Sequence, residues 1–242
     1  MGSFLGDFME IIVKAPASCG ELVEGILNGT PFLVTAPISM YAVATVSDTF
    51  SGVHGLGEKA EEAMARTLAH IGQDSLPYGI RLDSAIPQGK GMASSSADIA
   101  AVSYAVARAL GRELTGREIM DIAIAIEPSD GIALTGLSHV SHTTGELFGQ
   151  YFNVPLLAVS IFDVGGTVDT TKARGTAAIR MRHTDSCWIP SIRHSERMDT
   201  DRKCCSVRQL QRAHASIRCI WKSPDWRNLL LQRKERERLV FS

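Results

Sequence analysis

The chain has 242 residues, of which 45% are hydrophobic and 21% are charged, and its formal net charge is −1. This composition excludes a disordered or collagen-like chain, and the length suits one large domain or two small ones. No apolar run approaches the roughly 20 residues that cross a bilayer, and residues 1–8 lack the basic and apolar regions of a signal peptide. We therefore expect a cytoplasmic protein without a membrane partner.

The first 170 residues predict a mixture of strands and helices. Runs rich in β-branched residues predict strands at residues 10–15, 32–35, 41–46, 79–86 and 156–162, the first ended by Pro16. Apolar residues at helical spacing predict helices over residues 57–71 and 94–110, and a third from Thr115 to the residue before Pro128. Glu118 follows Thr115 by three positions, which is the capping-box pattern. The pattern indicates an α+β fold.

Residues 86–98 (IPQGKGMASSSAD) carry the most specific chemical signal. Gly89 and Gly91 allow positive φ and a close backbone approach, and serines fill the first turn of the helix that follows. A helix N-terminus presents unpaired N–H groups and a partial positive charge, so it suits a phosphate. The glycine spacing fits neither a Walker A loop nor a Rossmann fingerprint. The alternative is an ordinary strand–helix turn in which Ser94 and Ser96 only cap the helix.

Two carboxylates, Glu127 and Asp130, stand at the end of the predicted third helix. Their spacing lets one bind a metal ion while the other acts on a hydroxyl group. The alternative is a solvated helix end, which the spacing by itself favours. Carboxylates at a helix C-terminus face the negative end of the helix dipole, which is unfavourable and so favours a functional reason for this pair.

The loop after the first predicted strand holds Cys19 and Glu21. Cys19 is the one cysteine of residues 1–170, so neither a disulfide nor a Cys-x-x-Cys metal site is predicted there, and we expect it to pack as a small buried residue. Glu21 has the chemistry to bind an amino or hydroxyl group of a substrate, or to pair with a lysine.

The composition changes sharply after Thr170. Residues 1–170 carry 8 Lys and Arg against 19 Asp and Glu, whereas residues 171–242 carry 17 against 7 and hold one of the 21 glycines. Three interpretations of the basic part are open: an arm that contacts nucleic acid or membrane, a helical extension, or an out-of-frame translation. A helix is predicted only over residues 226–240, and the arginines elsewhere follow no helical face, which favours the shifted frame. Zinc binding is not predicted, because Cys204 and Cys205 are adjacent.

The order of these motifs resembles the GHMP kinases, the superfamily named for galactokinase, homoserine kinase, mevalonate kinase and phosphomevalonate kinase. Residues 87–97 resemble its phosphate loop, Pro-x-x-x-Gly-Leu-Gly-Ser-Ser-Ala, with Met92 in the Leu place and Ala93 in that of the third Gly. Further stretches are similar to the L-threonine kinases of cobalamin biosynthesis; they are residues 16–25, 126–131 and 163–170.

The resemblance covers about residues 10–170 and stops where the composition changes. It implies an α+β, GHMP-kinase-like ATP-binding domain over residues 1–170, of the ribosomal protein S5 domain 2-like type. It also implies that the family's ferredoxin-like C-terminal domain is missing or is replaced by residues 171–242, a basic tail that we expect to be out-of-frame or disordered.

The resemblance further implies ATP and Mg²⁺ as cofactors and L-threonine, or a similar amino alcohol, as the substrate that becomes O-phospho-L-threonine. It assigns Ser95 and Glu127 to Mg²⁺, Asp130 to the catalytic base, and Cys19 and Glu21 to the acceptor. The residues expected around the phosphates are Pro87, Gly89, Lys90, Gly91, Met92, Ala93, Ser94, Ser95 and Ser96.

Some alternatives stay open beside these assignments. For Lys90, an exposed loop lysine is the preferred interpretation over a phosphate contact. A homoserine kinase-like enzyme and an inactive remnant without the second domain are the alternative functions, and a nucleic-acid-binding tail is disfavoured because no binding motif is present.

Overall fold

The computed structural model describes residues 9–27, 29–152, 154, 158–163, 165–166 and 217–222. The helices are α1 (Glu58–Ile71), α2 (Ser94–Ala109) and α3 (Gly116–Ile126), with the short 3₁₀ helix η1 (Gly131–Ala133). The strands are β1 (Glu10–Ser18), β2 (Val23–Leu27), β3 (Thr30–Thr35), β4 (Pro37–Ser47), β5 (Val53–His54), β6 (Gly79–Ser84), β7 (Leu137–Val140), β8 (Leu147–Tyr151), β9 (Ala158–Asp163) and β10 (Ile217–Lys222). The predicted α+β class is confirmed.

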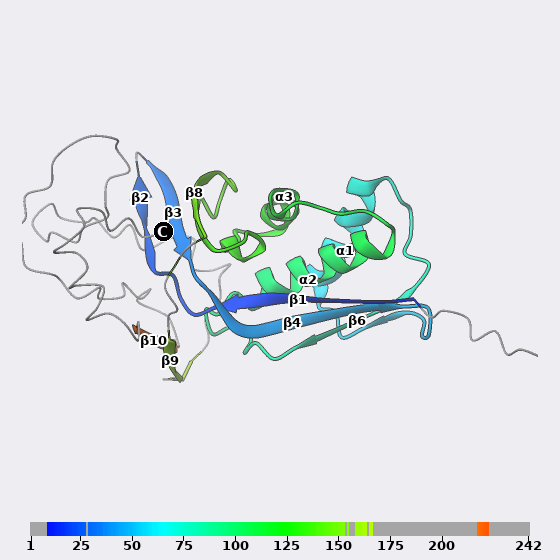
Figure 1. The fold of residues 1–242 in the computed structure, drawn as a ribbon, viewed down its shortest axis with the longest axis horizontal. Helices are drawn as coiled ribbons and strands as arrows, with labels where there is room; N and C mark the ends of the chain where they lie inside the picture. The colour runs from blue at the N-terminus through cyan, green and yellow to red at the C-terminus, as the bar shows by residue number, and fades with distance from the viewer. Residues whose placement is uncertain are drawn as a thin grey trace, which may run out of the picture.

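The described strands form three sheets. The first has the order β1-β4-β6-β5, with β5 parallel to β6 and the other pairs antiparallel. The second is antiparallel with the order β2-β3-β7-β8, and β9 pairs with β10 in a third, two-stranded sheet. Only Ala36 separates β3 from β4, so the chain passes almost directly from the second sheet into the first (Figure 1).

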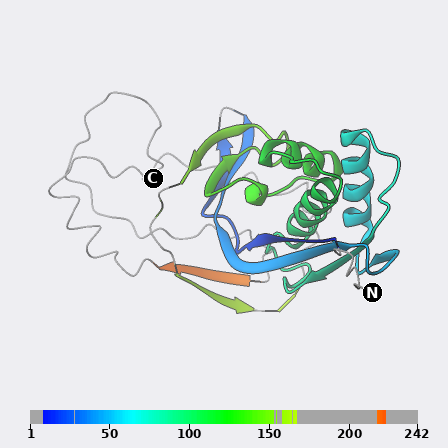
Figure 2. The same cartoon turned by 45° about the vertical axis from the view of Figure 1, so that its right-hand side comes forward.

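All three helices cover the same face of the first sheet, and α2 lies against the strands (Figures 1 and 2). Its small alanines allow a close approach, and most of its side chains are buried between β1 and β4 on one side and α1 and α3 on the other. A helix that is apolar on nearly all sides is stable only in such an interior position. The position of α2 fixes where its N-terminus, and the loop before it, can lie.

The first strand is longer than the sequence predicts. β1 continues through Pro16 to Ser18, and its register against β4 shifts between Pro16 and Ala17. A β-bulge of this kind accommodates a residue without an N–H donor. The extension carries the chain up to the loop that precedes α2.

The other predicted elements agree with the structure to within a few residues, including the capping box of Thr115 and Glu118. The strands that the sequence did not predict are β2, β5, β7, β8 and β10. The helix predicted over residues 226–240, and most of the basic tail, lie outside the described residues. Among the helices described here, none has the length and apolarity needed to cross a bilayer.

Candidate active site

The loop between β6 and α2 takes a conformation that depends on its glycines. Gly89 and Gly91 have φ of 65° and 74°, and Ala93, at the N-cap of α2, has φ of 57°. The Met92 side chain between them is 1% exposed and belongs to the main hydrophobic core. The loop is therefore anchored by Met92, while Pro87 and Gly91 stay exposed.

The N-terminus of α2 has no side-chain cap among the described residues. The Ser94 hydroxyl donates to Gln88 Oε1 at 3.3 Å, and the Ser96 hydroxyl accepts from the Asp130 amide at 3.4 Å. The interpretation of Ser94 and Ser96 as simple helix caps is therefore wrong, because both hydroxyls bond to other loop groups. The uncapped amides of this turn, beside the half-buried Ser95, suit an anion.

Gln88 connects the loop to the first turns of α2. Its amide nitrogen donates to Asp98 Oδ2 at 3.3 Å while its carbonyl oxygen accepts from Ser94. Burial raises the pKa of Asp98, and the hydrogen bonds from Gln88 and Ser84 lower it by less. Sequence reasoning missed Gln88, because a single glutamine in a glycine loop carries no pattern.

The end of β1 lies against this loop. The Ser18 amide donates to the Met92 carbonyl at 3.2 Å, and the Gly20 amide donates to the Gly91 carbonyl at 3.4 Å. These two bonds flank Cys19, which is fully buried, and they place the half-buried Glu21 just after the junction. The two predicted acceptor residues and the predicted phosphate loop are thus brought together.

Cys19 is buried as expected, but it is disulfide-bonded. The prediction that Cys19 takes no disulfide is therefore wrong. Cys19 is the one cysteine of residues 1–170. The error has a simple cause, since the pairing was considered only within that part of the chain.

The segment after α3 is held from several directions. The half-buried Asp130 bonds through its amide to Ser96, and the Gly131 amide donates to Thr35 Oγ1 at 3.0 Å. Ser138 Oγ donates to the Gly131 carbonyl at 2.9 Å. Residues from α2, β3 and β7 thus fix this segment beside the first turn of α2, with Asp130 next to the phosphate loop helix.

Glu127 is the C-cap of α3, and its side chain is 10% exposed. Glu127 Oε2 accepts from Lys59 Nζ at 2.5 Å, and Oε1 is buried with no hydrogen-bond donor among the described residues. A buried carboxylate oxygen without a partner is costly, and a cation would satisfy it. Glu127 Oε1 therefore has the chemistry of a ligand for a divalent cation that prefers oxygen. Lys59 is a neighbour that the sequence did not indicate.

Lys90 is not the exposed loop lysine of the alternative interpretation. Its side chain is 18% exposed, and Nζ lies 3.0 Å from Asp163 Oδ1 and 2.9 Å from the Gly166 carbonyl oxygen. Asp163 and Gly166 belong to the stretch that the sequence singled out at residues 163–170, and they contact the loop before α2 through this lysine.

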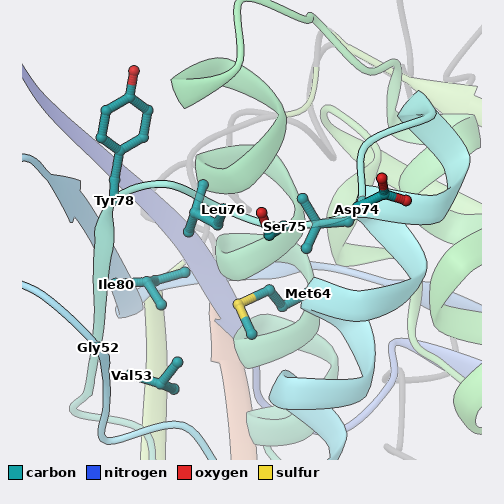
Figure 3. A pocket seen from close by; sticks show the side chains of 9 residues that line it. Gly52, Val53, Met64, Asp74, Ser75, Leu76, Tyr78 and Ile80 are labelled. Atoms are coloured by element: carbon teal, nitrogen blue, oxygen red, sulfur yellow. The ribbon is translucent and has the colours of Figure 1, made fainter.

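A hollow of about 310 Å³ lies elsewhere, between α1 and the start of β6 (Figure 3). Met64 and Ile80 point toward one another across it. The lining residues are Gly52, Val53, Met64, Leu68, Asp74, Ser75, Leu76, Tyr78 and Ile80. None of the predicted site residues lines it, and the phosphate loop follows the opposite end of β6, so the hollow is separate from the candidate site.

Residues 58–138 match the family model described as the GHMP kinases N terminal domain. This range contains the uncapped turn of α2, the glycine loop before it and the Glu127–Asp130 segment. This part of the chain is therefore similar to the N-terminal domain of the GHMP kinases. The glycine loop carries Ala93 where the GHMP-kinase pattern has its third glycine, and Ala93 adopts the left-handed conformation that a glycine would favour.

Two curated proteins similar to this chain are L-threonine kinases. The chain is 36% identical to that of Citrobacter freundii over 141 residues, which cover 54% of this chain and 46% of the relative. It is 35% identical to that of Salmonella typhimurium over 136 residues, covering 54% and 44%. The matched part thus spans about half the length of these relatives.

Solved structures share the fold of this chain. The mevalonate kinase of Methanococcus jannaschii superimposes with a TM-score of 0.51 at 16% identity, over 69% of this chain and 65% of that one. Another mevalonate kinase gives a TM-score of 0.50 at 15% identity, over 59% and 56%.

Proposed function

We propose that this chain is the nucleotide-binding part of an ATP-dependent kinase that phosphorylates the hydroxyl group of L-threonine. The observation that carries the proposal is the convergence of three segments at the N-terminus of α2. The end of β1 bonds to the phosphate loop through the Ser18 and Gly20 amides, and the acidic segment bonds to it through the Asp130 amide. The similarity to two L-threonine kinases supports this acceptor.

In this proposal the phosphates of ATP bind the amides at the start of α2 and the glycine loop before it, and Ser95 and Glu127 hold Mg²⁺. The metal supplies charge neutralisation to the transferring phosphoryl group. Lys59 keeps one oxygen of Glu127 engaged and leaves Oε1 for the cation. No cluster of three or more potential metal-binding His, Cys, Asp or Glu side chains occurs in the described part, so serine, phosphate and water oxygens would complete the coordination.

Asp130 acts as the general base of the proposed reaction. Its carboxylate accepts the proton of the acceptor hydroxyl as the hydroxyl oxygen attacks the terminal phosphoryl group of ATP. Glu21 lies at the neighbouring junction and contacts the acceptor, whereas Cys19, expected beside it, is fully buried and disulfide-bonded and does not. Phosphoryl transfer has a loose transition state, so orientation and charge stabilisation supply most of the catalysis. The backbone bonds that fix all three segments fit that requirement.

The test of this mechanism is Asp130→Asn. We expect a loss of turnover of about 10²- to 10⁴-fold, because a general base is removed, with ATP affinity unchanged. Threonine-dependent ADP release and calorimetric ATP titration measure the two quantities. Asp121→Asn is the matched control, since Asp121 lies on α3 in an ion pair with Arg117 and should leave both unchanged. Equal turnover of Asp130→Asn and the unmodified chain would remove Asp130 from the mechanism.

A second candidate is a GHMP-kinase remnant that binds ATP but does not transfer phosphate. The observation that favours it is the basic, glycine-poor composition of residues 171–242. Thermal stabilisation by ATP without ADP release, with either threonine or homoserine as acceptor, would support the remnant. ADP release with homoserine rather than threonine would change the substrate but keep the reaction.

A further inference from the structure

The side chain of Lys90, in the proposed phosphate loop, is held by specific contacts. The residue lies between Gly89 and Gly91, and its ammonium group contacts Asp163 Oδ1 at 3.0 Å and the Gly166 carbonyl oxygen at 2.9 Å. These partners come from a turn more than 70 positions further along the chain. A cation within the candidate phosphate site is therefore paired with a carboxylate from a distant segment.

The turn that holds Lys90 is built around one carboxylate oxygen. Asp163 Oδ1 accepts from the Gly165 amide at 2.8 Å as well as from Lys90. The Gly165 amide, and then Lys90, hold the pKa of Asp163 below its ordinary value. Asp163 is thus a carboxylate at neutral pH and an electrostatic competitor for the lysine.

The Lys90–Asp163 pair is suited to exchange. The Asp163 side chain is 57% exposed, and ion pairs this exposed are weak because solvent screens them. A lysine ammonium is a compact charge with rotatable donors on a flexible stem, so it changes partner with little rearrangement. Phosphates bound at the adjacent helix N-terminus carry more negative charge than one carboxylate, and the lysine is already on the loop that cradles them.

We propose that Lys90 leaves Asp163 for a phosphate of the bound nucleotide, so that Asp163 sets the affinity of the site by competing for this lysine. The inference rests on the proposed binding of ATP at this loop. It adds Asp163 as an affinity-determining residue that does not itself touch the nucleotide.

A double-mutant cycle on the full chain tests the proposal, with dissociation constants for Mg²⁺-ATP and for inorganic tripolyphosphate measured by calorimetry. Asp163→Asn should bind both ligands about two- to five-fold more tightly, because the competing surface ion pair is removed. Lys90→Ala should bind both more weakly. In the Lys90→Ala background, Asp163→Asn should have no effect.

Asp121→Asn controls for the change in net charge. Arg117 is shared between Asp121 and the Gly145 carbonyl oxygen in the same way that Lys90 is shared, and the Asp121 side chain is 55% exposed. This variant should leave both affinities unchanged. Asp163→Ser is a second variant, since its hydroxyl can still accept from the Gly165 amide without a charge, and it should reproduce the gain of Asp163→Asn.

Other results would overturn the proposal. They are weaker or unchanged binding by both Asp163 variants, the same gain in the Lys90→Ala background, or the same gain in Asp121→Asn. If the unmodified chain binds neither ligand, the proposed nucleotide site fails and this inference fails with it. Binding that is insensitive to Asp163 overturns this inference alone.

Discussion

Ala93 is the residue in which the chain before α2 departs furthest from ordinary backbone geometry. It is the one non-glycine residue with positive φ in the described part of the chain, and it is also the N-cap of α2. A Cβ in the left-handed region crowds the following carbonyl oxygen and costs roughly 1–2 kcal/mol. Strain of this kind persists only where the surroundings fix it, and here the buried Met92 and the bonds from β1 do so.

This geometry predicts opposite effects for two exchanges in the loop. Ala93→Gly should raise the free energy of unfolding by up to about 1 kcal/mol, because relief of the left-handed strain exceeds the extra entropy of an unfolded glycine. Gly91→Ala should lower it by about 1 kcal/mol, since Gly91 has φ of 74° and open space around the added Cβ. Urea unfolding midpoints measure both. A loss of stability in both variants would contradict the assigned conformation.

At the scale of one element, α3 connects a capping box that the sequence predicts to the acidic segment Glu127–Asp130. The position of that segment is known only from the structure. Thr115 and Glu118 form the capping box, with the Thr115 amide donating to Glu118 Oε2 at 2.7 Å. At the other end, Glu127 takes an extended conformation and turns the chain toward α2. A fixed start therefore sets the place of the Glu127–Asp130 segment.

The capping box predicts a component of acid sensitivity. The backbone and side-chain hydrogen bonds of Thr115 lower the pKa of Glu118 from 4.5 to about 2. Because the folded-state pKa is the lower one, this stabilisation is present above pH 4.5 and is lost as the pH falls toward about 2. Glu118→Gln should therefore lose less stability over that range than the unmodified chain.

Thermal unfolding at a series of pH values measures this difference. Glu113→Gln is the control, since Glu113 pairs with Arg108 on the surface and takes no part in the capping box. The slope of Glu113→Gln should match that of the unmodified chain. Identical slopes for the unmodified chain and Glu118→Gln would refute the assignment.

At the scale of the whole molecule, two sheets and three helices meet at one place. Thr35 belongs to the second sheet and Ser96 to the helical layer, yet both bond to the segment after α3. The site residues therefore depend on the packing of the complete body. Gly131 shows how tight this meeting point is, because an added Cβ would lie 2.1 Å from Ser138 Oγ.

The change of composition at residue 170 predicts a result at the level of the gene. We expect that another reading frame of codons 165–242 encodes a glycine-rich, acidic-to-neutral continuation, because residues 171–242 hold one of 21 glycines and 17 of the 25 basic residues. Sequencing this region and translating all three frames is the measurement. If no other frame is open and glycine-rich, the basic tail is authentic and its arginines need a binding partner.

The sequence anticipated much of the fold. Helical periodicity, the capping box and the glycine loop are local patterns, and the observed α1, α2 and α3 follow them within one or two residues. Short strands such as β5 and β7 were missed, because their existence depends on partners distant in sequence. The sequence predicted that the first strand ends at Pro16, because proline usually ends a strand. The bulge that accommodates Pro16 depends on pairing with β4, which the local sequence does not reveal.

The sequence by itself determined which residues could cradle a phosphate and which carboxylates stood near a helix end. Only the tertiary structure decided that Lys90 is held by Asp163, that Ser96 bonds to the Asp130 amide, and that Lys59 engages Glu127. The physical reason is that hydrophobic periodicity and turn chemistry act over a few residues. These three contacts join residues that only the packing of α2 against its sheet and its neighbouring helices brings together.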